Sequence, residues 1–336
     1  MLATLKLARW LGPWAGAHTA PRVASVDEAV AGVRVRTYGR AGGRTFLIAP
    51  GLHYAGPDDP RMDRFCRILA AAGHHVVAPF IPDYLALTPG ARAIADFTRV
   101  FDTVAERRPI VFSISFGSLL AFALAAARGD AIDKLVIFGG YADFHETMKF
   151  CLTGEVASGR HATRDPLNQP VVMMNLLDHL EHARGEREHL VAGWRRYVER
   201  TWGRPEMKAR ERFVAIAEEL APEVPASVRE LFLIGIGALP GAWELARPAL
   251  ARFDARALDP GPYLPRVTGR VELVHGADDD VIPFEQSHDL AARLTGADVR
   301  VHITGLYGHT GARRPPLTAV GKELFTMLRV LRALAG

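Results

Sequence analysis

Residues 113–117 place a serine where it can act as a nucleophile. The segment Ser113-Ile114-Ser115-Phe116-Gly117 follows a short apolar run and precedes a helix-forming stretch. It matches the G-x-S-x-G pattern of a nucleophile elbow, with serine in place of the first glycine. Small residues are needed two positions before and after the central serine because strand and helix nearly touch there. We therefore predict that Ser115 is the nucleophile.

The alternative for this segment is an ordinary buried strand followed by a helix, with serines that bond to nearby backbone carbonyls. Later residues favour catalysis, because a serine nucleophile in a strand-to-helix elbow needs an acid and then a histidine further along the chain. Residues 270–283 form a strand-like run that breaks at Gly276 and continues into three consecutive acids. Residues 298–303 then indicate another strand, and His309 follows it.

His309 is the predicted general base. The unperturbed pKa of histidine, about 6.5, allows it to accept the serine proton near neutral pH and return it to the leaving group. An aspartate on the other ring nitrogen would fix the tautomer and stabilise the imidazolium. The amide of Phe116, directly after the nucleophile, would supply one donor of an oxyanion hole.

These motifs, in this order, resemble the α/β-hydrolase family over roughly residues 30–140 and 265–336. In that family the acid lies in a G-x-x-D-x-x-hydrophobic-P loop, so the resemblance implies Asp279, with Asp278 and Asp280 as alternatives in register. Some relatives carry the acid after an earlier strand, which makes Asp143 the alternative acid.

The same resemblance extends to the start of the chain. Pro50-Gly51-Leu52-His53 is similar to the family's His-Gly-x loop, with proline where histidine usually stands, and implies Leu52 as the second oxyanion donor. Residues 58–65 and 78–84 also look like the early part of bacterial members described only as hydrolases. That likeness implies no substrate.

Apolar strand-like runs alternate with helical patterns, which predicts an α/β protein with a doubly wound, mostly parallel sheet. This is the α/β-hydrolase fold that the motifs imply. The expected strands are 29–36, 45–49, 75–78, 110–113, 134–138, 271–275 and 300–303. The expected helices between them are 61–72, 92–106, 116–128, 284–294 and 316–334.

The strand rhythm stops between Gly139 and Pro265, where Gly and Pro signals separate a series of helical patterns. The expected helices there are 168–183, 187–202, 207–220, 226–236 and 241–252. We expect a hydrolase core of residues 1–140 and 265–336, with residues 141–264 inserted late in the sheet. In the family such an insertion is typically a helical cap, or lid, that covers the serine and selects substrates.

Composition restricts the partners that the sequence predicts. The chain has 41 basic and 37 acidic side chains, and no basic stripe interleaved with aromatics, so nucleic-acid binding is not expected. Cys66 and Cys151 are the only cysteines and lack metal-type spacing, which favours a reducing cytoplasm and predicts neither a metal nor another cofactor. No apolar run is long enough for a transmembrane helix. Residues 1–11 are expected to form a short amphipathic helix that packs on the protein itself, with a partner or a membrane surface as alternatives.

The predicted function is hydrolysis of a carboxylic ester or related acyl bond in a small molecule, by a cytoplasmic serine esterase with a Ser-His-Asp catalytic triad and an acyl-enzyme intermediate. Acyl transfer and carbon–carbon bond hydrolysis use the same triad and stay open. A catalytically inactive protein of this fold, with a binding or interaction role, is the alternative from a different class. The sequence predicts neither the substrate nor the oligomeric state.

Overall fold

The computed structural model describes residues 2–12, 15–16, 19–40, 42–180, 183, 185–305, 307–308, 311–312 and 320–335. The chain divides into two compact units. The sheet unit comprises Met1–Asp143 and Ala257–Gly336, and the helical unit comprises Phe144–Arg256. The helical unit is therefore an insertion into the sheet unit.

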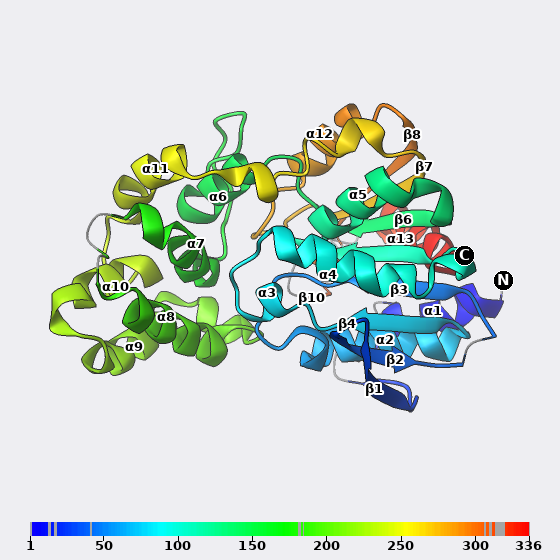
Figure 1. Cartoon of the computed structure of the whole chain (residues 1–336), viewed down its shortest axis with the longest axis horizontal. Coiled ribbons are helices and arrows are strands. Elements are labelled where there is room, and N and C mark those ends of the chain that lie inside the picture. Colours follow the sequence, from blue (N-terminus) through cyan, green and yellow to red (C-terminus); the bar gives the residue numbers. More distant parts are fainter. Residues whose placement is uncertain are drawn as a thin grey trace. The chain divides into compact units, whose positions relative to one another are not determined.

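The sheet unit is built on one eight-stranded sheet with the strand order β1-β2-β4-β3-β5-β6-β7-β8 (Figure 1). β2 runs antiparallel to β1 and β4, and all other neighbouring strands pair in parallel. The doubly wound, mostly parallel sheet predicted from the sequence is thus confirmed. The strands are β1 (Ser25–Val30), β2 (Val33–Tyr38), β3 (Thr45–Ala49), β4 (His75–Pro79), β5 (Ile110–Ile114), β6 (Lys134–Phe138), β7 (Gly269–Gly276) and β8 (Ala297–Thr304). In a small separate two-stranded sheet, β9 (Tyr307–Gly308) pairs antiparallel with β10 (Gly311–Ala312).

The central strands are composed mainly of apolar residues, as strands buried on both faces of a sheet must be. All five residues of β3 are buried, as are the first four of β5 and of β6. Such near-continuous apolar runs are typical of parallel strands covered by helices on both faces. Because β3, β5, β6 and β7 are parallel, the loops that follow them emerge at the same edge of the sheet.

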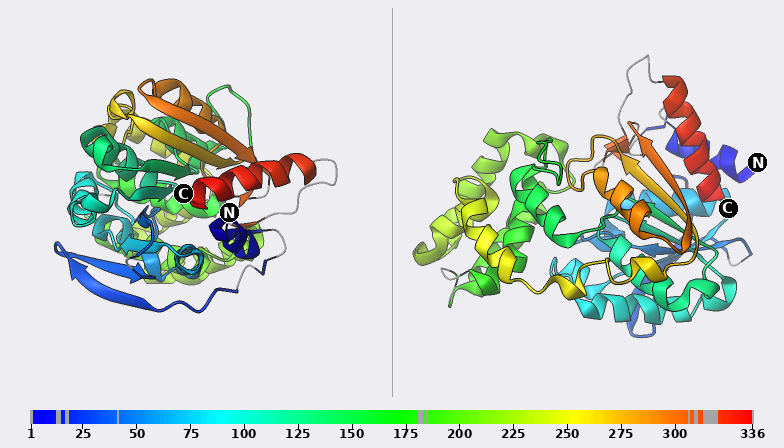
Figure 2. Two further views of the ribbon diagram at one scale, coloured as in Figure 1. Left: turned by 90° about the vertical axis from the view of Figure 1, so that its right-hand side faces the viewer. Right: turned by 90° about the horizontal axis from the view of Figure 1, so that it is seen from above.

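Helices cover both faces of the sheet (Figure 2). Those of the sheet unit are α1 (Leu2–Leu11), α2 (Pro60–Ala72), α3 (Pro82–Leu85), α4 (Ala91–Asp102), α5 (Gly117–Arg128), α12 (Glu285–Arg293) and α13 (Val320–Ala335). Right-handed crossovers put α4, α5 and α12 on one face, because their connections all advance along the sheet in the same direction. The connection through α2 runs the opposite way, so α2 lies on the other face.

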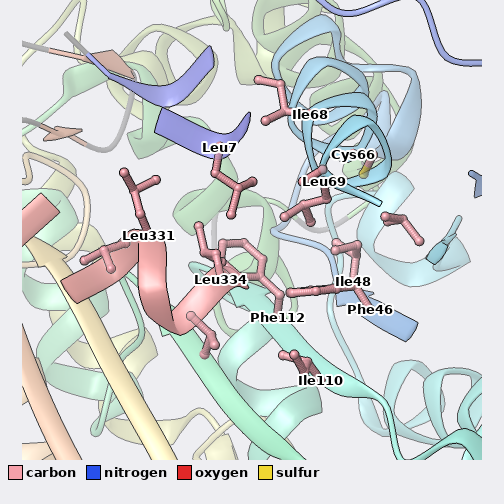
Figure 3. Packing of buried hydrophobic residues seen from close by; sticks show 14 of the residues in the cluster. Leu7, Phe46, Ile48, Cys66, Ile68, Leu69, Ile110, Phe112, Leu331 and Leu334 are labelled. Atoms are coloured by element: carbon pink, nitrogen blue, oxygen red, sulfur yellow. The ribbon is translucent and has the colours of Figure 1, made fainter. Parts of the chain in front are cut away.

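A hydrophobic cluster fills the face that α2 covers (Figure 3). Leu7 of α1, Leu69 of α2 and Leu331 of α13 are at most 1% exposed and meet Phe46 and Phe112 of the sheet. The amino-terminal helix therefore packs on the protein itself, as the amphipathic pattern predicts.

The predicted strand 29–36 is wrong, because the chain forms a hairpin there. β1 and β2 pair antiparallel from Ser25 opposite Tyr38 to Val30 opposite Val33. Ala31 and Gly32 form the turn, with φ values of 49° and 81°. Two consecutive positive φ values are typical of the two-residue turn that matches the twist of antiparallel strands.

The helical unit consists largely of six helices in its described part. They are α6 (Phe144–Thr153), α7 (Gln169–Leu176), α8 (Arg187–Thr201), α9 (Arg210–Leu220), α10 (Arg229–Ile236) and α11 (Ala242–Arg252). The last five correspond to expected helices with shorter bounds, whereas α6 was not anticipated. In the core of this unit the Trp194 indole N–H donates to the Phe232 carbonyl at 3.1 Å.

No helix in the described part of the chain combines the length and the apolar character needed to cross a membrane.

Candidate active site

Ser115 occupies a strained turn between β5 and α5. Its φ is 53°, and among the four non-glycine residues described with positive φ it is the one that follows a central strand. Its amide donates to the Phe138 carbonyl of β6 at 2.8 Å, and its carbonyl accepts from the Ser118 amide at 2.9 Å. Ser115 thus ends the strand and begins the helix with a backbone conformation that costs about 1–3 kcal/mol.

Steric crowding explains the residue types around the elbow. A Cβ at Gly117 would lie 2.2 Å from the Ala49 carbonyl oxygen and 2.6 Å from that of Pro50. Neither backbone oxygen can move far, so position 117 requires glycine. Ser113 tolerates its side chain, but its hydroxyl is buried and has no hydrogen-bond partner among the described residues.

The loop after β3 lies against the elbow. A Cβ at Gly51 would be 3.2 Å from the Ile114 carbonyl oxygen and 3.6 Å from the Ser115 Cβ. The next residue is Leu52, and within the described part of the chain neither its amide nor that of Phe116 donates to another protein group. The two amides predicted to form an oxyanion hole are therefore on adjoining segments, and neither N–H group is bonded to a described residue.

Two tyrosines brace the elbow. The Tyr84 hydroxyl, from α3, donates to the Phe116 carbonyl at 2.9 Å, and burial raises the Tyr84 pKa. The Tyr141 ring lies 4.9 Å from the Phe116 ring, and its hydroxyl donates to the Leu258 carbonyl at 2.6 Å. Sequence analysis assigned neither tyrosine to the site, since both contacts join segments far apart in the chain.

His53 forms a small network at the end of the oxyanion loop. Its Nδ1 accepts from the Ala55 amide at 3.1 Å, which leaves the proton of the neutral ring on Nε2, 3.3 Å from Asp59 Oδ2. Arg61 Nη2 donates to the same carboxylate at 2.9 Å. Burial, reinforced by the Arg61 charge and opposed by Asp59, lowers the His53 pKa to about 4. His53 is therefore neutral at pH 7 and is engaged in holding the loop.

The acid loop after β7 buries the predicted acid. The Asp279 side chain is 1% exposed, and its Oδ1 accepts from the Val281 and Ile282 amides, both at 2.9 Å. Asp280 is also buried, whereas Asp278 is exposed. Amide donors stabilise a carboxylate in its charged form and fix its direction.

Two buried histidines, His275 on β7 and His302 on β8, are engaged by neighbouring residues. His275 Nδ1 lies 2.7 Å from Ser287 Oγ, and Nε2 lies 2.8 Å from the Ile282 carbonyl and 3.5 Å from Asp279 Oδ2. His302 Nε2 pairs with Glu272 Oε2 at 2.8 Å. Burial raises the Glu272 pKa, but His302 and Arg300 outweigh it, so the net shift is downward.

Asp143, the alternative acid, lies in the loop after β6. Its amide and that of Ala142 donate to Gln286 Oε1, at 3.1 and 2.8 Å. Arg293 of α12 also donates to the Ala142 carbonyl, at 2.9 Å. The loop is thereby fixed to α12, with the Asp143 carboxylate half-buried.

The structure brings part of the predicted site together. Ser115 and Phe116 follow β5, Leu52 follows β3 and Asp279 follows β7, all at one edge of the sheet. Ligands of open α/β sheets bind at this edge. His309, the predicted base, lies outside the described residues. Among the described residues no group of three or more His, Cys, Asp or Glu side chains is arranged to hold a metal ion.

No protein-family model matches the chain. Similar solved structures include the meta-cleavage product hydrolase CumD of Pseudomonas fluorescens IP01, with 16% identity, TM-score 0.44, and coverage of 91% of this chain and 96% of that one. The thioesterase domain of the curacin biosynthetic pathway shows 15% identity, TM-score 0.44, and coverage of 94% and 98%. A serine hydrolase of the polyaromatic-hydrocarbon-degrading bacterium Cycloclasticus zankles shows 13% identity, TM-score 0.44, and coverage of 93% and 98%.

The fold itself follows from the strand order, with β2 alone antiparallel and a serine elbow after β5. This arrangement is the α/β-hydrolase fold, as the sequence motifs predicted.

Proposed function

We propose that the protein is a serine hydrolase that cleaves a carboxylic ester or related acyl bond of a small molecule. The observation that carries this proposal is the positive φ of Ser115 at the end of a central strand. Gly117 and Gly51 pack so closely around this turn that the strain is built into the fold. Strained backbone of this kind gathers at functional sites because it presents a side chain that a relaxed turn would not.

In the proposed reaction Ser115 Oγ attacks the acyl carbon while His309 takes its proton. The carbonyl electrons move onto oxygen, and the Leu52 and Phe116 amides stabilise the oxyanion. The intermediate collapses as His309 returns the proton to the leaving alcohol, which forms the acyl-enzyme. Water, deprotonated by His309, then attacks the acyl-enzyme and releases the acid. Asp279 holds His309 in the correct tautomer.

The surroundings of the elbow support the oxyanion step. Tyr84 fixes the Phe116 carbonyl by a buried hydrogen bond, and His53 fixes the loop that carries Leu52. Donors held in place before the reaction stabilise developing charge without reorganisation, and each one typically contributes a factor of about 10²–10³ in rate.

Labelling with a fluorophosphonate tests the proposal without a known substrate. The probe forms a covalent phosphonyl adduct with an activated serine and loses fluoride. We expect mass spectrometry to locate one adduct on Ser115 of the wild type, and Ser115→Ala and His309→Ala to abolish it. Ser113→Ala is the matched control, because that buried serine lies two residues away and has no role in the reaction.

The outcomes separate the candidates. An adduct that depends on His309 and survives Ser113→Ala supports an activated nucleophile, and an ester panel then tests the substrate class. Absence of any adduct from folded wild-type protein, with a small probe, contradicts the proposal and favours a binding role for the fold. Labelling that persists in Asp279→Asn but disappears in Asp143→Asn would move the acid to Asp143.

The proposal includes the role of the helical unit as a cap that selects substrates. It is supported by where the unit enters the sequence, between β6 and β7. Asp143 precedes this insertion directly, and the acid loop follows the strand after it. The insertion thus separates the segments that carry the proposed acid, Asp279, and the alternative acid, Asp143.

A further inference from the structure

The two terminal helices pack together on the sheet although they come from opposite ends of the sequence. α1 contacts α2 and α13 (Figure 2). Their inner sides belong to the core, with Leu7 on α1 and Met327, Leu331 and Leu334 on α13, all at most 3% exposed (Figure 3). The contact is therefore an anchored part of the sheet unit.

The outer sides of both helices expose apolar residues. Leu2 and Leu5 of α1 are 69% and 62% exposed, and Phe325 and Leu328 of α13 are 56% and 42% exposed. They make up four of the six large hydrophobic side chains that are exposed in the described part of the chain. Burying such side chains removes apolar area from water, so this concentration needs an explanation.

Basic residues continue each apolar stripe at the same spacing. On α1 the exposed series is Leu2, Leu5, Lys6 and Arg9; on α13 it is Phe325, Leu328, Arg329 and Arg332. Both follow the i, i+3, i+4, i+7 pattern, which places four residues on one side of a helix. We name these eight residues the terminal-helix face.

No negative charge offsets these four cations on their own helices. The sequences of α1 and α13 contain one acid, Glu323. It is 8% exposed and accepts a hydrogen bond from the Thr304 hydroxyl at 2.7 Å, on the buried side of α13. The Arg329 guanidinium lies 4.5 Å from the Phe325 ring, so the apolar and cationic groups are interleaved.

The combination of exposed apolar and cationic side chains indicates which partner the terminal-helix face would bind. A second copy docked by the same face would bring two sets of four cations together, and like charges across an interface are unfavourable. An anionic bilayer offers negative headgroups for the cations and a hydrocarbon boundary for the leucines and phenylalanine. Neither helix can cross a bilayer, so binding would be parallel to its surface.

We propose that the terminal-helix face is a docking surface for bilayers that contain anionic phospholipids. Apolar contact supplies part of the binding, and Lys6, Arg9, Arg329 and Arg332 make it depend on lipid charge. The proposal goes beyond acyl-bond hydrolysis and does not depend on it, since neither helix contributes to the candidate active site.

Sedimentation of the full chain with vesicles tests the proposal. We expect binding to phosphatidylcholine vesicles that contain phosphatidylglycerol, little binding to phosphatidylcholine alone, and weaker binding as salt rises. Arg329→Gln with Arg332→Gln should lower the partition coefficient roughly fivefold for each charge removed. Leu5→Gln with Leu328→Gln should weaken binding while keeping helix-compatible side chains.

Matched controls replace exposed residues outside the terminal-helix face, two in the sheet unit and one in the helical unit. Arg266→Gln with Arg270→Gln removes two exposed charges elsewhere on the sheet unit, and Leu239→Gln removes an exposed leucine of the helical unit. Both controls should bind vesicles as the wild type does. Circular dichroism melting checks that every variant is folded.

Three outcomes overturn the proposal. In the first, the folded protein does not bind anionic vesicles. In the second, the control substitutions weaken binding as much as those on the terminal-helix face. In the third, light scattering shows a dimer that Leu5→Gln with Leu328→Gln dissociates, which would assign the face to a second copy. Fluorophosphonate labelling of Ser115 is independent of all three, so failure here leaves the proposed hydrolase function standing.

Discussion

Gly117 makes the closest approach between the helix α5 and the loop after β3. A Cβ there would lie 2.2 Å from a backbone oxygen, so the elbow cannot accept alanine without a shift of the chain. We expect Gly117→Ala to reduce the free energy of unfolding by about 3 kcal/mol or more and to abolish fluorophosphonate labelling of Ser115. Urea unfolding followed by circular dichroism measures the first effect.

Gly42→Ala is the control, because a Cβ at Gly42 meets no atom within 4 Å. It should leave stability within about 0.5 kcal/mol of the wild type. A Gly117→Ala protein with wild-type stability and labelling would show that the crowding at the elbow is not a constraint.

The lowered pKa of His53 should make the stability of the protein depend on pH. This pKa is about 4 in the folded protein, against about 6.5 for an unperturbed histidine. Between these values the unfolded chain binds a proton on this ring that the folded chain does not, so stability decreases as the pH falls from about 6.5 to about 4. The shift corresponds to at most about 3 kcal/mol.

His53→Gln isolates this contribution. Glutamine can accept from the Ala55 amide and donate to Asp59 but does not titrate. The difference in unfolding free energy between wild type and variant should therefore change across this pH range and level off above about pH 7. Parallel stability curves from pH 4 to 7 would contradict a depressed His53 pKa.

The sequence indicates candidate site residues where chemistry and local sterics coincide. Ser115 and Gly117 are recognisable because a strand-to-helix turn constrains neighbours within two positions. Tyr84 and Gln286 act through hydrogen bonds to Phe116 and Ala142, and those partners are distant in sequence. No local pattern encodes such contacts, so sequence reasoning missed both residues.

Among the elements, strand predictions succeeded for the buried parallel strands and failed at the edge. β3 and β6 have the predicted bounds because continuous apolar runs mark them. The hairpin of β1 and β2 was read as one strand, since Ala31-Gly32 interrupts the alternating pattern only briefly. Helix α6 was not expected, although Asp143 directly before it and Glu146 in its first turn match the start signal of a helix.

The packing of α8 against α10 depends on Gly235. A Cβ there would lie 2.3 Å from Trp194 Cζ2 and 2.6 Å from Cε2. Alanine gains about 1 kcal/mol of helix propensity over glycine, but overpacking a core typically costs about 1–3 kcal/mol. We expect Gly235→Ala to destabilise the helical unit by about 1–2 kcal/mol, measured by thermal unfolding.

A double-mutant cycle identifies the cause. Trp194→Phe removes the ring atoms that the new Cβ would touch, at the expense of the indole hydrogen bond to Phe232. In that background Gly235→Ala should cost less than in the wild type. Equal costs in the two backgrounds would place the strain somewhere other than the indole.

At the scale of the whole molecule, the segments that lead into and out of the insertion are hydrogen-bonded to each other. The Tyr141 hydroxyl donates to the Leu258 carbonyl at 2.6 Å, so the segments before and after the helical unit are joined within the sheet unit. A chain in which a short Gly-Ser linker replaces residues 144–256 can thus keep the connection from β6 to β7. A flexible linker spans such a gap at little entropic cost.

We expect this shortened chain to fold with its sheet intact and to keep His309-dependent labelling of Ser115, because the predicted triad lies entirely in the sheet unit. If the helical unit restricts access, a bulky fluorophosphonate should label the full chain more slowly than a small one and label the shortened chain at nearly the same rate. The ratio of the two labelling rates is the measurement. A folded, labelled chain with an unchanged ratio would contradict the cap role, and it would leave the nucleophile assigned to Ser115.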